Sequence, residues 1–326
     1  MKSLITGGAG FIGCHLAERL VELNHKVIIL DNLSTGRKRN LDKIKHKVKF
    51  IKCDISKDNN LAKYFNKVDF IFHLAALADI VPSIENPKSY FSSNVHGTLN
   101  VLQASKKNKI KKFIYAASSS CYGIPKIYPT PEISKINPQY PYALTKWLGE
   151  ELVMHWHKVY KLNTISLRFF NLYGTRSRTT GAYGAMFGTF LAQKLAGLPF
   201  TVVGNGNQKR DFTYISDAVD AIILAAKSNF SGEIFNVGSG KSVSVNRIIK
   251  LLGGKKIFIA KRPGEPNNTF ADIKKIKKSL NWLPKVNIEQ GIEILKKNIN
   301  DWQDAPVWTR DKIEIATKVW FKYLKK

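Results

Sequence analysis

The sequence predicts an α/β fold: a doubly wound parallel sheet with a smaller C-terminal region beside the strand ends. Two observations predict it. Short apolar runs rich in β-branched residues alternate with helix-length amphipathic stretches through the first half of the 326-residue chain, which is typical of βαβ units. The first of these runs leads directly into a glycine-rich turn followed by a helical pattern.

Six segments of the first half have the composition of buried parallel strands. They are residues 3–6, 26–30, 48–53, 70–74, 112–117 and 164–169. Amphipathic helices are predicted at residues 11–23, 87–107 and 140–160. We therefore expect residues 1–170 to form the domain that contains the sheet, with residues 208–237 returning to it.

The second half, residues 171–326, has a less regular pattern and is expected to form mainly the smaller region and a C-terminal tail. Helices are predicted at residues 183–195 and 245–252, and loops at the Gly-, Pro- and Asn-rich residues 204–206 and 262–268. The tail, which starts at residue 301, carries Trp302, Trp308 and Trp320, and residues 313–324 have helical spacing. Packing against the rest of the protein is its expected role.

The chain is strongly basic, with 52 Lys and Arg against 24 Asp and Glu and a net charge of +28. Such a charge is compatible with nucleic-acid binding, but the basic residues are scattered and accompany no aromatic RNA-binding strand or basic arm. A lysine-rich bias over solvated faces is the simpler interpretation, and it would also attract anionic substrates. We expect no nucleic-acid partner.

Hydropathy and cysteine usage favour a cytoplasmic protein. No apolar run approaches the ~18 residues that span a bilayer, and the N-terminus runs straight into a strand, so we expect neither a membrane segment nor a signal peptide. Cys14, Cys53 and Cys121 are widely spaced and form neither a disulfide framework nor a zinc pattern. No metal site is expected.

A dinucleotide site is predicted where the first strand ends. Gly7, Gly10 and Gly13 stand in a Gly-x-x-Gly-x-x-Gly turn between strand and helix. Glycines there allow a tight turn and let backbone N–H groups approach a pyrophosphate. Asp31 closes the second strand, where an acid can bind a ribose hydroxyl, and its charge favours NAD over NADP. The sheet is therefore expected to be of the Rossmann type, with NAD as cofactor.

Further cofactor contacts are expected at the ends of neighbouring strands. They are Phe11 and Ile12 in the turn, Asn32 beside Asp31, Asp54 and Ile55 after the third strand, and Leu74, Ala75 and Ala76 after the fourth. Arg37 and Arg39 leave a 2′-phosphate contact open as the alternative. For His73, a buried position at a strand end is favoured over a catalytic role.

A catalytic group is predicted on the helix at residues 140–160. Tyr142 and Lys146 are four residues apart and share one helical face. A tyrosine with a pKa near 10 is a poor base at neutral pH, but a neighbouring ammonium and a positive nicotinamide ring both favour the phenolate. The strand at residues 112–117 runs into Ser118, Ser119 and Ser120, where a hydroxyl can bind the substrate oxygen that loses its proton.

These motifs resemble those of the extended short-chain dehydrogenase/reductase family, and within it the nucleotide-sugar epimerases of the UDP-glucose 4-epimerase type. The resemblance extends over nearly the whole chain. It rests on residues 31–36, 94–98, 168–174, 210–214, 235–240 and 262–266 in addition to the glycine turn and the Tyr142/Lys146 pair.

The resemblance implies a role for each matching residue. Tyr142 would be the base, Lys146 would modulate its pKa and bind the ribose, and Ser118 would be the hydrogen-bonding partner. Asn94 and Phe170 would contact the cofactor. The substrate-binding set would be Ser118, Ser119, Ser120, Tyr142, Asn171, Thr201, Val203, Arg210, Arg262 and Thr269, with Asn171 and the two arginines on the nucleotide diphosphate. A threonine at position 269 would leave room for an N-acetylated sugar.

The implied reaction is epimerisation at C4 of a nucleotide-diphosphate sugar, UDP-glucose/UDP-galactose or the N-acetylated pair, through a 4-keto sugar. The family also contains 4,6-dehydratases, which resemble Thr-Asp-Glu where this chain has Ser118, Ser119 and Ser120, and decarboxylases, which have a glutamate at the position of Ser120. Another nucleotide-sugar enzyme, or a non-catalytic Rossmann binding protein, is the alternative. The family commonly forms homodimers through two helices per subunit, here residues 86–107 and 140–160.

Overall fold

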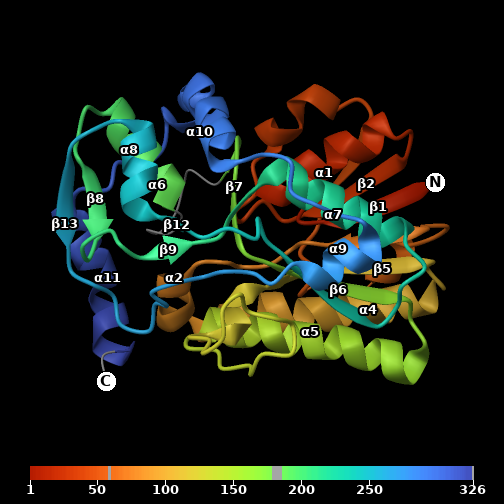
Figure 1. The fold of residues 1–326 in the computed structure, drawn as a ribbon. Coiled ribbons are helices and arrows are strands. Elements are labelled where there is room, and N and C mark those ends of the chain that lie inside the picture. The colour runs from red at the N-terminus through yellow and green to blue at the C-terminus, as the bar shows by residue number, and fades with distance from the viewer. Residues whose placement is uncertain (58–59, 178–185, 325–326) are drawn as a thin grey trace.

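The computed structural model describes residues 1–57, 60–177 and 186–324, and at its centre lies a seven-stranded parallel sheet (Figure 1). The strands lie side by side in the order β3–β2–β1–β4–β5–β6–β11. They are β1 (Lys2–Thr6), β2 (Lys26–Asp31), β3 (Val48–Lys52), β4 (Phe70–His73), β5 (Lys112–Ser118), β6 (Thr164–Phe169) and β11 (Glu233–Val237). The predicted Rossmann-type sheet is thus confirmed, and each of the six predicted strands ends within one residue of its expected bounds.

Helices cover both faces of this sheet. The helices α1 (Phe11–Glu22) and α7 (Ile215–Lys227) lie on one face, and α4 (Gly97–Lys107) and α5 (Pro141–Tyr160) on the other (Figure 1). Alternate residues of β1 point to opposite faces, so Ile5 packs in the cluster with Leu16 of α1, whereas Leu4 packs in the cluster with Trp156 of α5. Burial on both faces explains why the strands are almost uniformly apolar.

The order of the strands reverses between β1 and β4, which are neighbours in the sheet. The chain passes from β1 outward through β2 and β3, and then returns to β4 on the other side of β1. In such sheets the loops after the two central strands diverge and leave a crevice at their carboxyl ends, where ligands bind. The glycine turn after β1 and the residues after β4 lie at this crevice.

The predicted helix at residues 87–107 is interrupted. It consists of α3 (Pro87–Tyr90), a π-helical segment η3 (Phe91–His96) and α4. Within the π-helical turn, Asn94 accepts a hydrogen bond from the backbone N–H of Leu77 and donates to Thr145 of α5. Helical periodicity alone does not reveal such a turn, and the contacts made within it are with a distant loop and helix.

The second half of the chain contains more regular structure than the sequence pattern indicates. A smaller region beside the strand ends (left in Figure 1) is built from α6 (Met186–Leu195), β8 (Phe200–Val203), α8 (Val245–Leu252), β13 (Lys256–Ile259), α10 (Ile288–Lys297) and α11 (Arg310–Leu324). The predicted helices at residues 186–195 and 245–252 are present, while residues 183–185 lie outside the described part.

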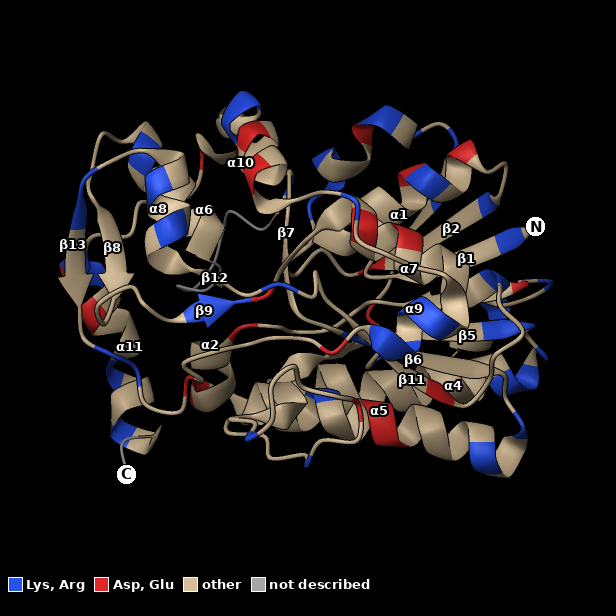
Figure 2. Ribbon diagram, in the orientation of Figure 1, with Lys and Arg blue, Asp and Glu red and all other residues tan. Residues whose placement is uncertain are grey.

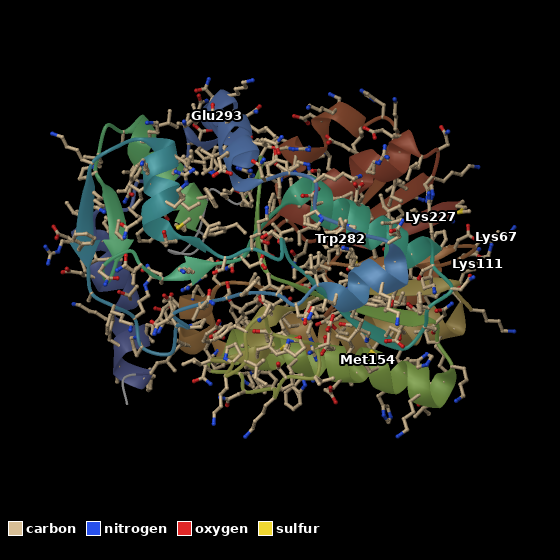
Figure 3. The ribbon with its side chains drawn as sticks, viewed as in Figure 1. Lys67, Lys111, Met154, Lys227, Trp282 and Glu293 are labelled. Atoms are coloured by element: carbon tan, nitrogen blue, oxygen red, sulfur yellow. The ribbon has the colours of Figure 1, made fainter. Side chains whose placement is uncertain are left out.

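The remaining elements of the described residues are short. They are α2 (Ile80–Glu85), β7 (Asn171–Tyr173), β9 (Lys209–Arg210), β10 (Phe212–Tyr214), β12 (Val243–Ser244), α9 (Lys274–Leu280) and the short helices η1 (Lys38–Ile44), η2 (Leu61–Tyr64), η4 (Ser119–Tyr122) and η5 (Ile299–Trp302). After α9, the buried Trp282 lies beside α7 (Figure 3) and donates its Nε1–H to the carbonyl of Asp217 at 3.0 Å. The indole therefore joins the late part of the chain to the sheet domain.

The positive charge is distributed over the periphery. Figure 2 shows Lys and Arg segments on the outer helices and loops of both regions, interspersed with acidic segments. This distribution agrees with a lysine-rich solvated surface. In the ranges that the structure describes, no helix has the length and apolarity needed to cross a membrane.

Candidate active site

The glycine turn closes tightly against the loop that follows β4. Gly7 has a φ of +73°, and a Cβ there would lie 2.7 Å from the backbone nitrogen of Ala75. A Cβ on Gly13 would lie 2.2 Å from the carbonyl oxygen of Gly7. Only glycine fits these two positions. The helix α1 begins after Gly10, which has no capping side chain, so the first-turn N–H groups suit a pyrophosphate.

Asp31 lies at the end of β2 and joins the two loops beside it. Its Oδ2 accepts from the N–H of Ala9 at 2.9 Å, and its Oδ1 accepts from the N–H of Leu33 at 2.8 Å. Burial raises the pKa of Asp31, and these backbone hydrogen bonds oppose the rise. Because a carboxylate oxygen can accept two hydrogen bonds, Asp31 can also bind a ribose hydroxyl.

The two arginines that could have selected a 2′-phosphate have other partners. The Arg37 guanidinium donates to the carbonyls of Arg176 and Ser177 at 3.3 and 3.4 Å. Arg39 forms an exposed ion pair with Asp304 at 3.2 Å. These contacts agree with a ribose diol, rather than a phosphorylated ribose, at Asp31.

The structure brings other predicted cofactor residues to the same crevice. Asn32 donates to Asp54 at 3.3 Å, and Ile55 next to it is buried. Leu74, Ala75 and Ala76 follow β4 directly. The Asn94 side chain accepts a hydrogen bond from the Leu77 N–H and donates one to the Leu77 carbonyl. It therefore holds the loop after β4 in place. The remaining members are Phe11 and Ile12, which are half-buried in the first turn of α1, and Phe170, which is buried after β6.

The histidine at the end of β4 is structural, as predicted. His73 is buried and bonds through Nδ1 to the Thr6 hydroxyl at 2.6 Å and through Nε2 to the Thr98 hydroxyl at 2.9 Å. Burial lowers its pKa to about 3. A neutral imidazole therefore links β1 to α4.

The predicted catalytic residues meet between η4 and α5. Tyr142, in the first turn of α5, faces Ser118 at the end of β5, and the Ser118 hydroxyl lowers the pKa of the phenol. The Ser118 Oγ also lies 2.8 Å from the Ser120 Oγ, and Ser119 stands between them. Burial raises the pKa of Tyr142 above its usual value, and the interaction with the Ser118 hydroxyl opposes that rise. A bound cation would be needed to favour the phenolate further.

Lys146 lies one turn after Tyr142 and is buried. Its Nζ is 4.3 Å from the centre of the Tyr115 ring. Burial lowers the pKa of Lys146 to about 7, although the Glu150 carboxylate raises it. The lysine can therefore change its protonation state near neutral pH, which suits a group that adjusts the charge beside a catalytic tyrosine.

A buried ion pair, which the sequence analysis missed, anchors this helix. Glu150 and Arg168 of β6 are 1% and 3% exposed, and the Arg168 Nε donates to the Glu150 Oε1 at 3.0 Å. Ser166 donates to the other carboxylate oxygen at 2.7 Å, and Arg168 also donates to the Tyr122 hydroxyl at 2.9 Å. The available signal was the spacing, since Glu150 continues the face that carries Tyr142 and Lys146 by one more turn.

The predicted diphosphate ligands share one carboxylate. Glu265 lies 3.6 Å from Arg210 and 3.1 Å from Arg262. Nearby, the Thr269 hydroxyl donates to the Asn171 side chain at 2.9 Å and accepts from the N–H of Asp211 at 3.0 Å. Two guanidinium groups converge here, and such groups match phosphate oxygens.

The predicted contacts on β8 belong to the smaller region. Thr201 is buried and accepts a hydrogen bond from Gln193 of α6 at 2.8 Å. Val203 packs with Ile259, Trp308 and Ile313 in a separate apolar cluster. Two of these neighbours come from the C-terminal tail, which the sequence analysis assigned only to packing.

Comparisons with known proteins agree with this arrangement. The chain is 37% identical to a putative UDP-glucose 4-epimerase of Methanocaldococcus jannaschii, over 92% of this chain and 97% of that protein. The structure resembles a UDP-glucuronic acid 4-epimerase from Bacillus cereus in complex with UDP-glucuronic acid and NAD, with a TM-score of 0.85, 33% identity and coverage of 92% and 99%. A UDP-N-acetyl-alpha-D-glucosaminuronate decarboxylase of Bacillus cytotoxicus is 33% identical over 90% of this chain and 95% of that protein.

The family model that matches is the NAD dependent epimerase/dehydratase family, over residues 3–238. This range contains the glycine turn, Asp31, Ser118, Tyr142 and Lys146. The chain therefore belongs to the NAD-dependent epimerase/dehydratase family, and its cofactor is NAD.

Proposed function

We propose that this protein epimerises a UDP-sugar at C4 through a 4-keto sugar. The observation that carries the proposal is the contact between Tyr142 and Ser118 beside a buried lysine of lowered pKa, together with the serines at positions 119 and 120. By the family pattern, a dehydratase would need carboxylates at both of these positions and a decarboxylase a glutamate at position 120, whereas an epimerase needs only a proton acceptor and hydroxyl groups.

NAD, when bound, supplies a hydride acceptor and, once reduced, a hydride donor. The residues present fit it, because the tight turn at Gly7 and Gly13 suits a pyrophosphate and Asp31 suits a ribose diol. Tyr142 accepts the proton of the sugar 4-hydroxyl, and Ser118 binds the same oxygen. Tyr142 returns the proton after the sugar has presented its opposite face.

Lys146 assists Tyr142 electrostatically. A protonated lysine one helical turn away favours the phenolate and opposes the effect of burial on the pKa of Tyr142. Glu150 in turn favours the protonated lysine. Because Glu150 is tied to Arg168 and Ser166 of β6, the three helical residues keep a constant relation to the sheet.

Arg210 and Arg262 would hold the diphosphate while the sugar reorients. They come from β9 and from the loop after β13, and both contact Glu265. A nucleotide diphosphate would provide the oxygens that match the two guanidinium groups. Such a tether leaves the sugar free to turn without leaving the site.

The test compares Tyr142→Phe with the parent protein on a panel of UDP-, dTDP-, GDP- and CDP-sugars, with each product resolved. Loss of the base is expected to slow C4 epimerisation by about 10²–10⁴-fold, with bound NAD unchanged. Tyr140→Phe is the matched control, because the Tyr140 ring stacks 6.3 Å from that of Tyr142. Turnover of Tyr142→Phe within threefold of the parent, or decarboxylation or dehydration as the parent reaction, would contradict the proposal.

We also propose that the enzyme is a cytoplasmic homodimer. The helices α4 and α5 lie side by side (Figure 1), as an interface of two helices per subunit requires. The three cysteines are buried thiols, in keeping with a reducing compartment. Sedimentation equilibrium should give twice the chain mass, and a monomer at micromolar concentration would refute the dimer.

A further inference from the structure

The C-terminal tail reaches the predicted diphosphate ligands. Trp320 of α11 is 2% exposed and donates its Nε1–H to the carbonyl of Pro263 at 2.7 Å. The guanidinium carbon of Arg262 lies 5.2 Å from the centre of the Trp320 ring. One side chain of the tail thus contacts both Arg262 and the residue that follows it.

The same indole is linked to the catalytic helix. The ring of Tyr140, immediately before α5, lies 6.4 Å from that of Trp320 and 6.3 Å from that of Tyr142. A row of aromatic rings therefore runs from the proposed base to the proposed diphosphate ligand. Trp320 is the member of this row that comes from the tail.

Further contacts hold α11 in this position. Gln193 of α6 donates to the carbonyl of Trp308 at 2.6 Å, just before α11. Ile313 and Trp308 pack with Val203 and Ile259. The tail is therefore fixed to β8 and β13 at one end and to the Arg262 loop at the other.

A cavity lies beside Arg262, so the contact with Trp320 can affect where the Arg262 side chain points. Its volume is about 350 Å³, and residues of α11 and of the end of β13 line it. Its lining includes Ile259, Arg262, Ile313, Thr317 and Phe321. Space is thus available into which the guanidinium can turn. The indole face and its hydrogen bond to Pro263 oppose that movement.

We propose that Trp320 is a positioning residue that keeps Arg262 directed at the substrate diphosphate, so that the C-terminal tail forms part of the nucleotide-sugar site. This inference rests on the proposed function in taking Arg262 as a diphosphate ligand. It assigns α11 a role in substrate affinity, and it places no group of the tail on the reacting carbon.

The test measures the affinity of UDP and of uridine by isothermal titration calorimetry. Trp320→Leu removes both the aromatic face and the hydrogen bond and should raise the Kd of UDP roughly tenfold, from the usual strengths of these two contacts. Trp320→Phe keeps an aromatic face and should show a smaller rise. The Kd of uridine, which has no phosphate, should not change in either variant. Trp302→Phe is the control, a buried tryptophan of the tail whose packing lies in the main core.

Two further measurements separate positioning from general loss of structure. In steady-state assays, Trp320→Leu should raise KM about tenfold, while kcat and the NAD content stay near those of the parent. In an Arg262→Ala background, Trp320→Leu should weaken UDP binding no further, because its effect acts through Arg262.

Each outcome has a distinct meaning. Unchanged UDP affinity in both Trp320 variants, equal weakening of UDP and uridine, or additive losses with Arg262→Ala would overturn this inference alone. UDP binding by a parent protein that epimerises none of the sugars would overturn the proposed reaction alone. A parent protein with no measurable affinity for UDP would overturn both.

Discussion

Replacing Glu150 by glutamine should destabilise the protein far more than replacing a surface glutamate. The substitution preserves the shape of the side chain but removes its charge. Arg168 then keeps its positive charge without a counter-ion. The charge stays desolvated because the Arg168 and Glu150 side chains are only 4% and 1% exposed. Removing one partner of a buried pair is costly because the other charge stays desolvated.

The contacts of Glu150 indicate how much free energy of unfolding the substitution removes. The Glu150 carboxylate accepts from the Arg168 Nε at 3.0 and 3.1 Å and from the Ser166 hydroxyl at 2.7 Å. Glutamine keeps one acceptor oxygen but directs an NH₂ group at these donors. Breaking such a pair typically costs about 3–5 kcal/mol. The retained oxygen places Glu150→Gln near the lower end, at about 3 kcal/mol.

The assay is equilibrium unfolding in urea, followed by circular dichroism. Glu314→Gln is the control, because Glu314 pairs with Arg310 at 2.9 Å with both side chains more than half exposed. That change should cost less than about 1 kcal/mol. A loss below about 1 kcal/mol for Glu150→Gln would show that Arg168 is solvated or re-paired in the variant and would refute the reasoning.

Three further predictions concern the cofactor, the sugar and Lys146. Cofactor extracted from purified protein should be NAD(H), because Asp31 is buried beside the glycine turn; mainly NADP(H) would contradict this. Thr269→Tyr should depress turnover of a UDP-N-acetylhexosamine far more than that of UDP-galactose, because a bulky ring excludes the acetyl group. Thr269→Val is its control, since it loses the bonds to Asn171 and Asp211 but fills no space; equal losses on both sugars would refute the steric argument. The pKa of Lys146 falls from 10.5 to about 7 on folding, so the unfolded chain binds more protons in that range and folding stability gains as pH rises through it. The free energy of unfolding of the parent protein minus that of Lys146→Met should therefore increase from pH 7 toward pH 10.5. A difference that does not change with pH would contradict the lowered pKa of the buried lysine.

The sequence alone predicted the parts of the protein that depend on neighbouring residues. Apolar runs of strand length, the glycine turn and the acid at the end of β2 are local signals, and they located the sheet and predicted NAD as the cofactor. The spacing of Tyr142 and Lys146 predicted one helical face because helical geometry relates residues four apart. None of these predictions required knowledge of distant contacts.

Tertiary structure decided the contacts between residues far apart in the chain. The pairing of Glu150 with Arg168, the shared carboxylate of Glu265, the π-helical turn at Asn94 and the position of Trp320 on Arg262 each depend on how separate elements pack. A hydrophobic period shows which face of α11 is buried, but the partner of that face depends on the shape and charge of surfaces that only the folded chain brings together.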